Sequence, residues 1–176
     1  HYADVNPWSV AAPAGGGLLV SVNYQGSTTL FPGTGDEEEL DEDGAPRWAA
    51  SIAGSGLSGR ERDAPAAAFG IDAFDDGGVV VSGTVNNREP VNAGTGDVVF
   101  SDGETISPVG NTGVMIRYEP DGRRARTELT TIGYGGDVCV LPDGSVVMAA
   151  AFQPGAVFGA GQPGAITPPN RGLFDG

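Results

Sequence analysis

A tight turn joined to a run of valines, residues 75–83 (DDGGVVVSG), decides the fold of this chain. Asp76-Gly77 is a strong hairpin-turn dipeptide, because glycine adopts positive φ without strain and aspartate hydrogen-bonds to its own backbone. The three valines after the turn do not alternate with polar residues, so this strand is expected to be buried on both faces. Such a strand needs a neighbouring sheet on each side.

The same hairpin pattern recurs about three times along the 176 residues, at residues 9–24, 70–85 and 137–152. These segments align without gaps, and each consists of a strand, a turn and a second strand. The turn is followed by an apolar triplet, such as Val146-Val147-Met148, and then by small residues, such as Ala149-Ala150. Repeats of this kind predict an all-β, β-propeller-like fold with four-stranded antiparallel blades.

Two further motifs accompany the hairpins. An aromatic residue precedes a glycine-rich turn, with an apolar residue a few places later, in the pairs Phe31 and Leu40, Phe100 and Ile106, and Phe158 and Ile166. The other motif is an alternating strand, residues 113–118, that leads into a Pro-Asp-Gly turn. Its alternation predicts a strand with one buried and one wetter face, at a more peripheral place in the sheet.

Together these three motifs resemble SBBP-type bacterial β-propeller repeats, and the resemblance spans nearly the whole chain. It implies an exported or cell-surface protein and supplies no catalytic residue. Because propellers use about 4–8 blades, roughly three blades form an incomplete ring. Residues 1–176 are therefore expected to be a single partial propeller, completed by a protein partner or by the rest of a larger chain.

The first copy departs from the pattern after Leu40. The chain passes directly to a turn at Asp43-Gly44, and the counterpart of residues 107–118 is absent. A sheet that lacks this strand would leave backbone groups unpaired. We therefore predict that residues are missing between Leu40 and Asp41.

Charge and composition limit the partners and the location of the chain. The net charge is −14, and the field of such a surface repels nucleic acid and anionic lipid. No apolar run approaches the ~18 residues of a membrane span. A low content of lysine and cysteine with abundant glycine predicts an extracellular, cell-surface or periplasmic protein.

Catalytic motifs are missing from the sequence, so no catalytic or cofactor-binding residue is assigned. A serine or cysteine hydrolase needs a neighbouring base, and the single histidine is His1. Residues 56–60 (GLSGR) fail the nucleophile-elbow pattern at the last position, and no phosphate-binding loop occurs. Two carboxylates brought together in space stay open as an alternative, which would make the protein a carbohydrate-active enzyme.

The acidic run at residues 36–44 offers one candidate metal site. Glu39-x-Asp41-x-Asp43-Gly44 imitates the start of a calcium loop, because hard cations bind clustered oxygens. The acid expected at the twelfth place is replaced by Ala50, which favours a solvated turn. Calcium is thus a possible cofactor, and a calcium-stabilised adhesin is a second alternative function.

Four further side-chain groups complete the sequence predictions. Cys139, the one cysteine, lies in an apolar run and is expected to be a small buried residue. Trp48 and Trp8 suit sugar stacking, although core packing is favoured for Trp48. The cluster at residues 123–126 (RRAR) predicts an exposed outer strand with acidic partners.

From the repeats, the resemblance and the lack of catalytic motifs, the protein is expected to be a non-catalytic binding or structural module.

Overall fold

In the computed structural model, all secondary-structure elements among the described residues are β-strands. The described residues are 5–12, 18–24, 37–40, 46–50, 52–54, 66–86, 98–107, 111–130, 133–159 and 162–169. All strand pairs are antiparallel, which confirms the all-β prediction for this part of the chain. Within the same ranges, no helix is long and apolar enough to cross a membrane.

The strands form four separate sheets. The first sheet has the order β1 (Val5–Ala11), β2 (Leu18–Tyr24), β3 (Glu37–Leu40) and β4 (Pro46–Ala50). The second has the order β6 (Ala66–Ala73), β7 (Val79–Asn86), β10 (Asn111–Tyr118) and β11 (Arg124–Thr130). The third is a hairpin of β12 (Gly133–Val140) and β13 (Val146–Phe152). The fourth joins β5 (Ile52–Gly54), β8 (Val98–Phe100) and β9 (Thr105–Ile106).

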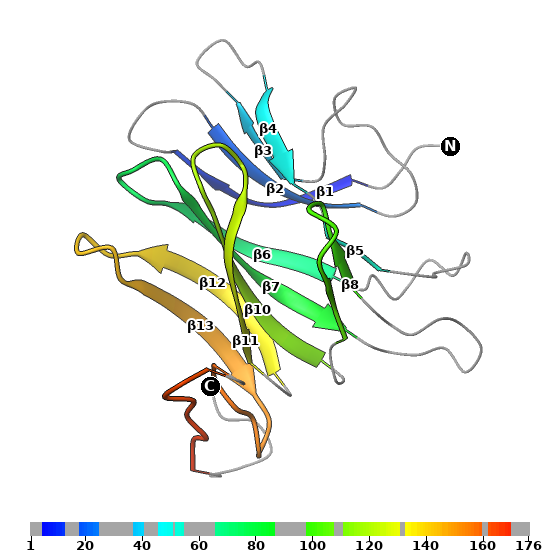
Figure 1. Ribbon diagram of the computed structural model, residues 1–176, viewed down its shortest axis with the longest axis vertical. Helices are drawn as coiled ribbons and strands as arrows, with labels where there is room; N and C mark the ends of the chain where they lie inside the picture. Colours follow the sequence, from blue (N-terminus) through cyan, green and yellow to red (C-terminus); the bar gives the residue numbers. More distant parts are fainter. Residues whose placement is uncertain are drawn as a thin grey trace.

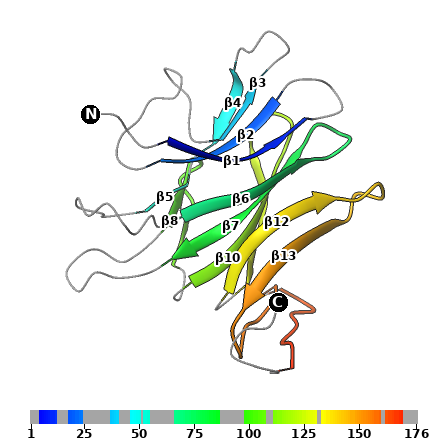
Figure 2. The ribbon, with the colours of Figure 1, turned by 180° about the vertical axis from the view of Figure 1, so that it is seen from behind.

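The first sheet, the second sheet and the β12–β13 hairpin lie one after another in chain order (Figure 1; Figure 2 from behind). β1 and β2 pack against β6, while β12 packs against β6, β7 and β10. Each of these layers contains one of the three recurring hairpins. The second sheet is therefore covered by a neighbour on both of its faces.

This double covering buries β7 from Val79 to Val85. Val79, Val80 and Val81 are 0%, 1% and 1% exposed. Val79 and Val81 belong to the core shared with Leu19 of the first sheet, whereas Val80 belongs to the core shared with Val138 of β12. Burial of a valine side chain contributes about 1.5–3 kcal/mol. The predicted burial of the valine strand on both faces is confirmed for this copy.

The equivalent strands of the other two copies are covered on one face only. Leu19 is fully buried, but Leu18 is 39% exposed on the opposite face of β2. In β13, Val146 and Met148 are half-buried against the second sheet, while Val147 is 54% exposed. Double burial was predicted for all three copies and is wrong for these two, because no described sheet covers their outer sides.

The third place in the first sheet is occupied by β3, which has 4 residues where β10 has 8. Leu40 lies opposite Leu18, just as Tyr118 lies opposite Val79 in the second sheet. In the first copy, β3 therefore takes the place of the strand whose sequence counterpart, matching residues 107–118, is absent. Residues 41–45, with the predicted break after Leu40, lie outside the described residues.

The aromatic–glycine motifs form small hairpins at two of their three places. β8 ends at Phe100, and the chain turns back to form β9, in which Ile106 pairs with Val98. Phe158 and Ile166 exchange two backbone hydrogen bonds of 2.9 and 3.0 Å. Phe31 lies outside the described residues.

The contrast between Val80 and Val147, which occupy the same place in two copies, gives the first prediction. Val80→Ala should lower the free energy of unfolding by about 2 kcal/mol, because it opens a cavity between two sheets. Val147→Ala removes the same atoms from a half-exposed face and should change it by less than about 0.5 kcal/mol. Urea unfolding of the two variants checks this, and equal losses would contradict the double covering of β7.

Candidate functional site

Four turns in the described residues share one construction. In the first, the Phe74 N–H donates to the Gly78 carbonyl and the Gly77 N–H donates to the Phe74 carbonyl. The Asp76 carboxylate accepts from the Gly78 N–H at 2.8 Å, and Gly77 has a φ of 86°. The same bonds recur in the turns that begin at Phe100, Glu119 and Leu141. The Asp-Gly turns are thus built from local contacts that the dipeptide itself supplies.

Two of these turns are each covered by an arginine from a neighbouring strand. The Arg117 guanidinium lies 4.2 Å from the centre of the Phe74 ring and pairs with Asp76 at 2.9 Å. The Arg124 guanidinium lies 4.3 Å from the centre of the Phe100 ring and pairs with Asp102 at 2.9 Å. This arrangement was not predicted from the sequence, although a signal was present. Phe-x-Asp-Gly occurs at both turns, and only the fold shows which arginine meets each.

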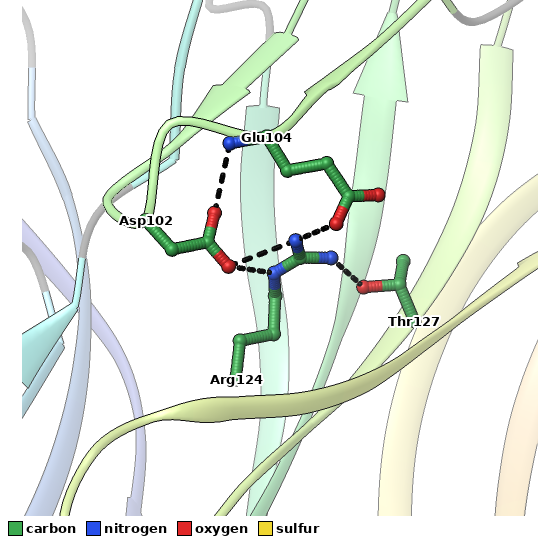
Figure 3. Close-up of polar contacts among 4 residues, drawn as sticks. All are labelled: Asp102, Glu104, Arg124 and Thr127. Atoms are coloured by element: carbon green, nitrogen blue, oxygen red, sulfur yellow. Dashed lines mark hydrogen bonds and ion pairs between the residues drawn. The ribbon is translucent and has the colours of Figure 1, made fainter.

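The Arg124 cluster is the densest group of charges in the described residues (Figure 3). The Arg124 side chain is only 7% exposed, whereas those of Asp102 and Glu104 are 42% and 60% exposed. Arg124 donates to the carboxylates of Asp102 and Glu104 and, at 2.6 Å, to the hydroxyl of Thr127. A guanidinium with all these acceptors has little capacity left for a ligand.

The same contacts shift two pKa values. Partial burial alone would raise the pKa of Asp102, but the Glu104 N–H and the adjacent Arg124 outweigh it, and the pKa lies below its ordinary value. Burial would lower the pKa of Arg124, but its bonds to Glu104 and Asp102 prevail, and the pKa is raised. Both groups are held in their charged forms, which suits a structural ion pair that fastens the β8–β9 turn to β11.

Polar bonds also join the second sheet to β12. The Val140 N–H donates to the Asp72 carboxylate at 2.7 Å. The Gly135 N–H donates to the Thr84 hydroxyl at 3.1 Å, and the Ser82 hydroxyl donates to the Gly136 carbonyl. A side chain at Gly135 would overlap the carbonyl of Gly83, so the two backbones touch here. This layer contact is therefore directional as well as apolar.

The opposite side of the third sheet has no such covering in the described part of the chain. We call it the outer face of β12–β13. Cys139 pairs with Val147 across the hairpin, and the two lie on the same side of it. The exposed apolar members of this face are Tyr134, Cys139, Leu141, Val147, Ala149 and Ala151. Asp143, in the turn between the two strands, adds charge at its margin. A strongly acidic chain thus presents an apolar surface on one sheet.

Cys139 corrects a sequence prediction. It was expected to be buried, and it is exposed on the outer face of β12–β13. The reason is the alternation along β12. Val138 and Val140 point toward the second sheet, so the residue between them points away from it.

The structure locates the other candidate residues as follows. Trp48 packs into the main core with its ring 5.8 Å from that of Tyr118, so the prediction of core packing is confirmed. The basic cluster lies in and beside β11, where Arg123 pairs with Asp121 and Arg126 with Glu128, as predicted. Arg124 also has acidic partners, but the prediction of exposure is wrong for it, because its side chain packs over the Phe100 ring. The side chain of Trp8 lies outside the described residues.

The described residues include only part of the proposed calcium loop, so they do not test the calcium hypothesis. Of the acidic run, only residues 37–40 have a described backbone, and Asp41 and Asp43 lie outside it. Elsewhere in the described ranges, no three histidine, cysteine, aspartate or glutamate side chains gather closely enough to hold a metal ion. The calcium site remains a prediction.

Comparison with known proteins gives no family for the chain. No protein-family model matches it, and no curated protein sequence matches it. Among solved structures, the chain is similar to a protein of unknown function from Bacteroides caccae, with 14% identity and a TM-score of 0.31. The similarity covers 88% of this chain and 56% of that one, so the chain spans little more than half of that protein's length.

The Arg124 cluster gives the second prediction. Arg124→Gln should lower the free energy of unfolding by about 1–2 kcal/mol, because it removes a buried charge from two carboxylates that stay partly hydrated. Arg126→Gln is the matched control on the same strand and should change it by less than about 0.5 kcal/mol, since that arginine is 68% exposed. Urea unfolding measures both, and equal effects would contradict the structural role of Arg124.

The lowered pKa of Asp102 gives the third prediction. A carboxyl whose pKa is lower in the folded than in the unfolded state stabilises the fold above its unfolded pKa of about 3.9, and this contribution is lost as the pH falls through the folded pKa. The wild type should therefore exceed Asp102→Asn in stability at neutral pH, and the gap should shrink toward about pH 3. Urea midpoints across this range measure the gap. A constant gap would show that Asp102 acts without its charge.

Proposed function

We propose that this chain is a non-catalytic binding and structural module of an exported or cell-surface bacterial protein. In this proposal its sheets are blades of an SBBP-type β-propeller. Two four-stranded antiparallel sheets support it, since each contains one recurring hairpin followed by two further strands. Stacking of consecutive copies on both faces of the second sheet supports it as well.

The outer face of β12–β13 is the single observation that carries the binding role. Val147 is 54% and Leu141 is 39% exposed there. These residues occupy the places that Val80 and Phe74 hold in the second copy, where β12 covers them. Contiguous apolar surface with a polar margin is typical of a protein-interaction site. The face thus has the composition of a sheet surface that another sheet covers.

The charge of the chain narrows the class of partner. At a net charge of −14, a polyanion such as nucleic acid is repelled, whereas an apolar sheet face of a protein has no charges of its own to be repelled. The proposed partner is therefore a protein, or the rest of a larger chain that completes the propeller.

The fourth prediction tests binding through the one cysteine of the chain. Cys139 is exposed on the outer face of β12–β13, so a thiol-reactive benzophenone can be attached there without any substitution. Irradiation with the envelope and secreted proteins of the producing bacterium should give a discrete protein adduct. Excess unlabelled wild-type chain should suppress this adduct, because both compete for one partner site.

Two variants serve as competitors in the same experiment. Val147→Glu places a charge on the apolar face and should fail to compete. Ala125→Glu adds the same charge at an exposed position on β11 and should compete like the wild type. The proposed function would be overturned by an adduct that neither the wild type nor Ala125→Glu suppresses. It would also be overturned by an adduct that Val147→Glu suppresses as well as the wild type does.

A further inference from the structure

The described layers contact one another in one repeated way. Between the first and second sheets, Leu19 packs with Val79 and Val81. Between the second sheet and the hairpin after it, Val80 packs with Val146 and Met148. Val80 holds the place of Leu19 in the aligned repeats, and Val146 and Met148 hold the places of Val79 and Val81. The same two surfaces therefore meet twice.

One copy of each of these two surfaces is exposed. The outer face of β12–β13 carries Val147 at the place of Val80. On the first sheet, Val10 and Leu18 are 57% and 39% exposed and hold the places of Val138 and Val146. Val10 pairs with Val20 across the hairpin, and Leu18 lies two residues from Val20 on the same strand. Val10 and Leu18 therefore share one side of the sheet, which we call the outer face of β1–β2. The chain thus carries both halves of a contact that it already makes twice.

We infer that a second copy of this chain docks head to tail, with its outer face of β1–β2 on the outer face of β12–β13. This inference rests on the proposed function and names the partner. The two faces differ, so the contact is heterologous, and a symmetric back-to-back dimer is not expected. Because each copy carries a charge of −14, added salt should strengthen the association by screening the repulsion.

The existing contact predicts which residues of the two copies become neighbours. Asp72 accepts from the Val140 N–H at 2.7 Å across the second sheet and β12. In the aligned repeats, Cys139 holds the place of Asp72, and Ala12 holds the place of Val140. Both Cys139 and Ala12 are exposed. Cys139 of one copy should therefore lie beside Ala12 of the next.

The fifth prediction uses this juxtaposition. The purified Ala12→Cys variant, treated with a short bismaleimide, should give a ladder of dimers and higher oligomers on a denaturing gel. The wild type contains Cys139 alone and should stay a single band, as should Ala125→Cys, whose new thiol lies on β11. Adding Val147→Glu to the Ala12→Cys variant should abolish the ladder.

Sedimentation provides a readout that needs no new cysteine. The average mass of the wild type should rise with protein concentration, and more steeply at about 0.5 M than at about 0.1 M salt. Val10→Glu and Val147→Glu should each be monomeric, while their mixture should form dimers, because each variant keeps one intact face. Circular dichroism confirms that each variant is folded.

Three results would overturn the inference: a wild type that stays monomeric at all concentrations, a wild-type dimer linked through Cys139, or a mixture of variants that does not associate. None of them affects the proposed function, which is overturned only by the crosslinking results: no adduct that excess wild-type chain suppresses, or an adduct that Val147→Glu suppresses equally well. The two failures are therefore distinguishable.

Discussion

The burial of β7 between two sheets is the constraint on which the rest of the structure depends. A strand with adjacent valines cannot satisfy both of its faces in a single layer, because one row would remain in water. Val79 and Val81 pack on one neighbour and Val80 on the other. The first sheet and the β12–β13 hairpin are thus held in place by the same strand, and the order of the layers follows the order of the repeats.

The turns show local and distant contacts acting on the same residues. Asp76 accepts a backbone hydrogen bond within its own turn and also pairs with Arg117 from β10. Asp102 does the same with Arg124 from β11. A turn whose local preference and tertiary contact agree is specified twice, which is the consistency expected of a sequence with one native fold. These acidic residues therefore stabilise hairpins through both kinds of contact.

Local chemistry explains which parts of the structure could be predicted from sequence. The strands around Asp76-Gly77 and Asp143-Gly144 follow from the turn dipeptides and the apolar triplets beside them. The exposure of Cys139 could not be predicted, since it depends on which face of β12 receives a neighbouring sheet. Neither could the partners of Arg117 and Arg124, which are brought together only by the pairing of distant strands. β3 was missed because its acidic residues show no strand alternation.

The contact of Gly83 with Gly135 has a consequence for the shape of any longer stack. At this end of the strands the two backbones touch, while at the turn end Phe74 and Val80 hold the layers apart. Two layers that are close at one end and separated at the other form a wedge. Successive wedges of the same hand curve an array toward its narrow side, so the absence of a side chain at position 135 helps to set the curvature.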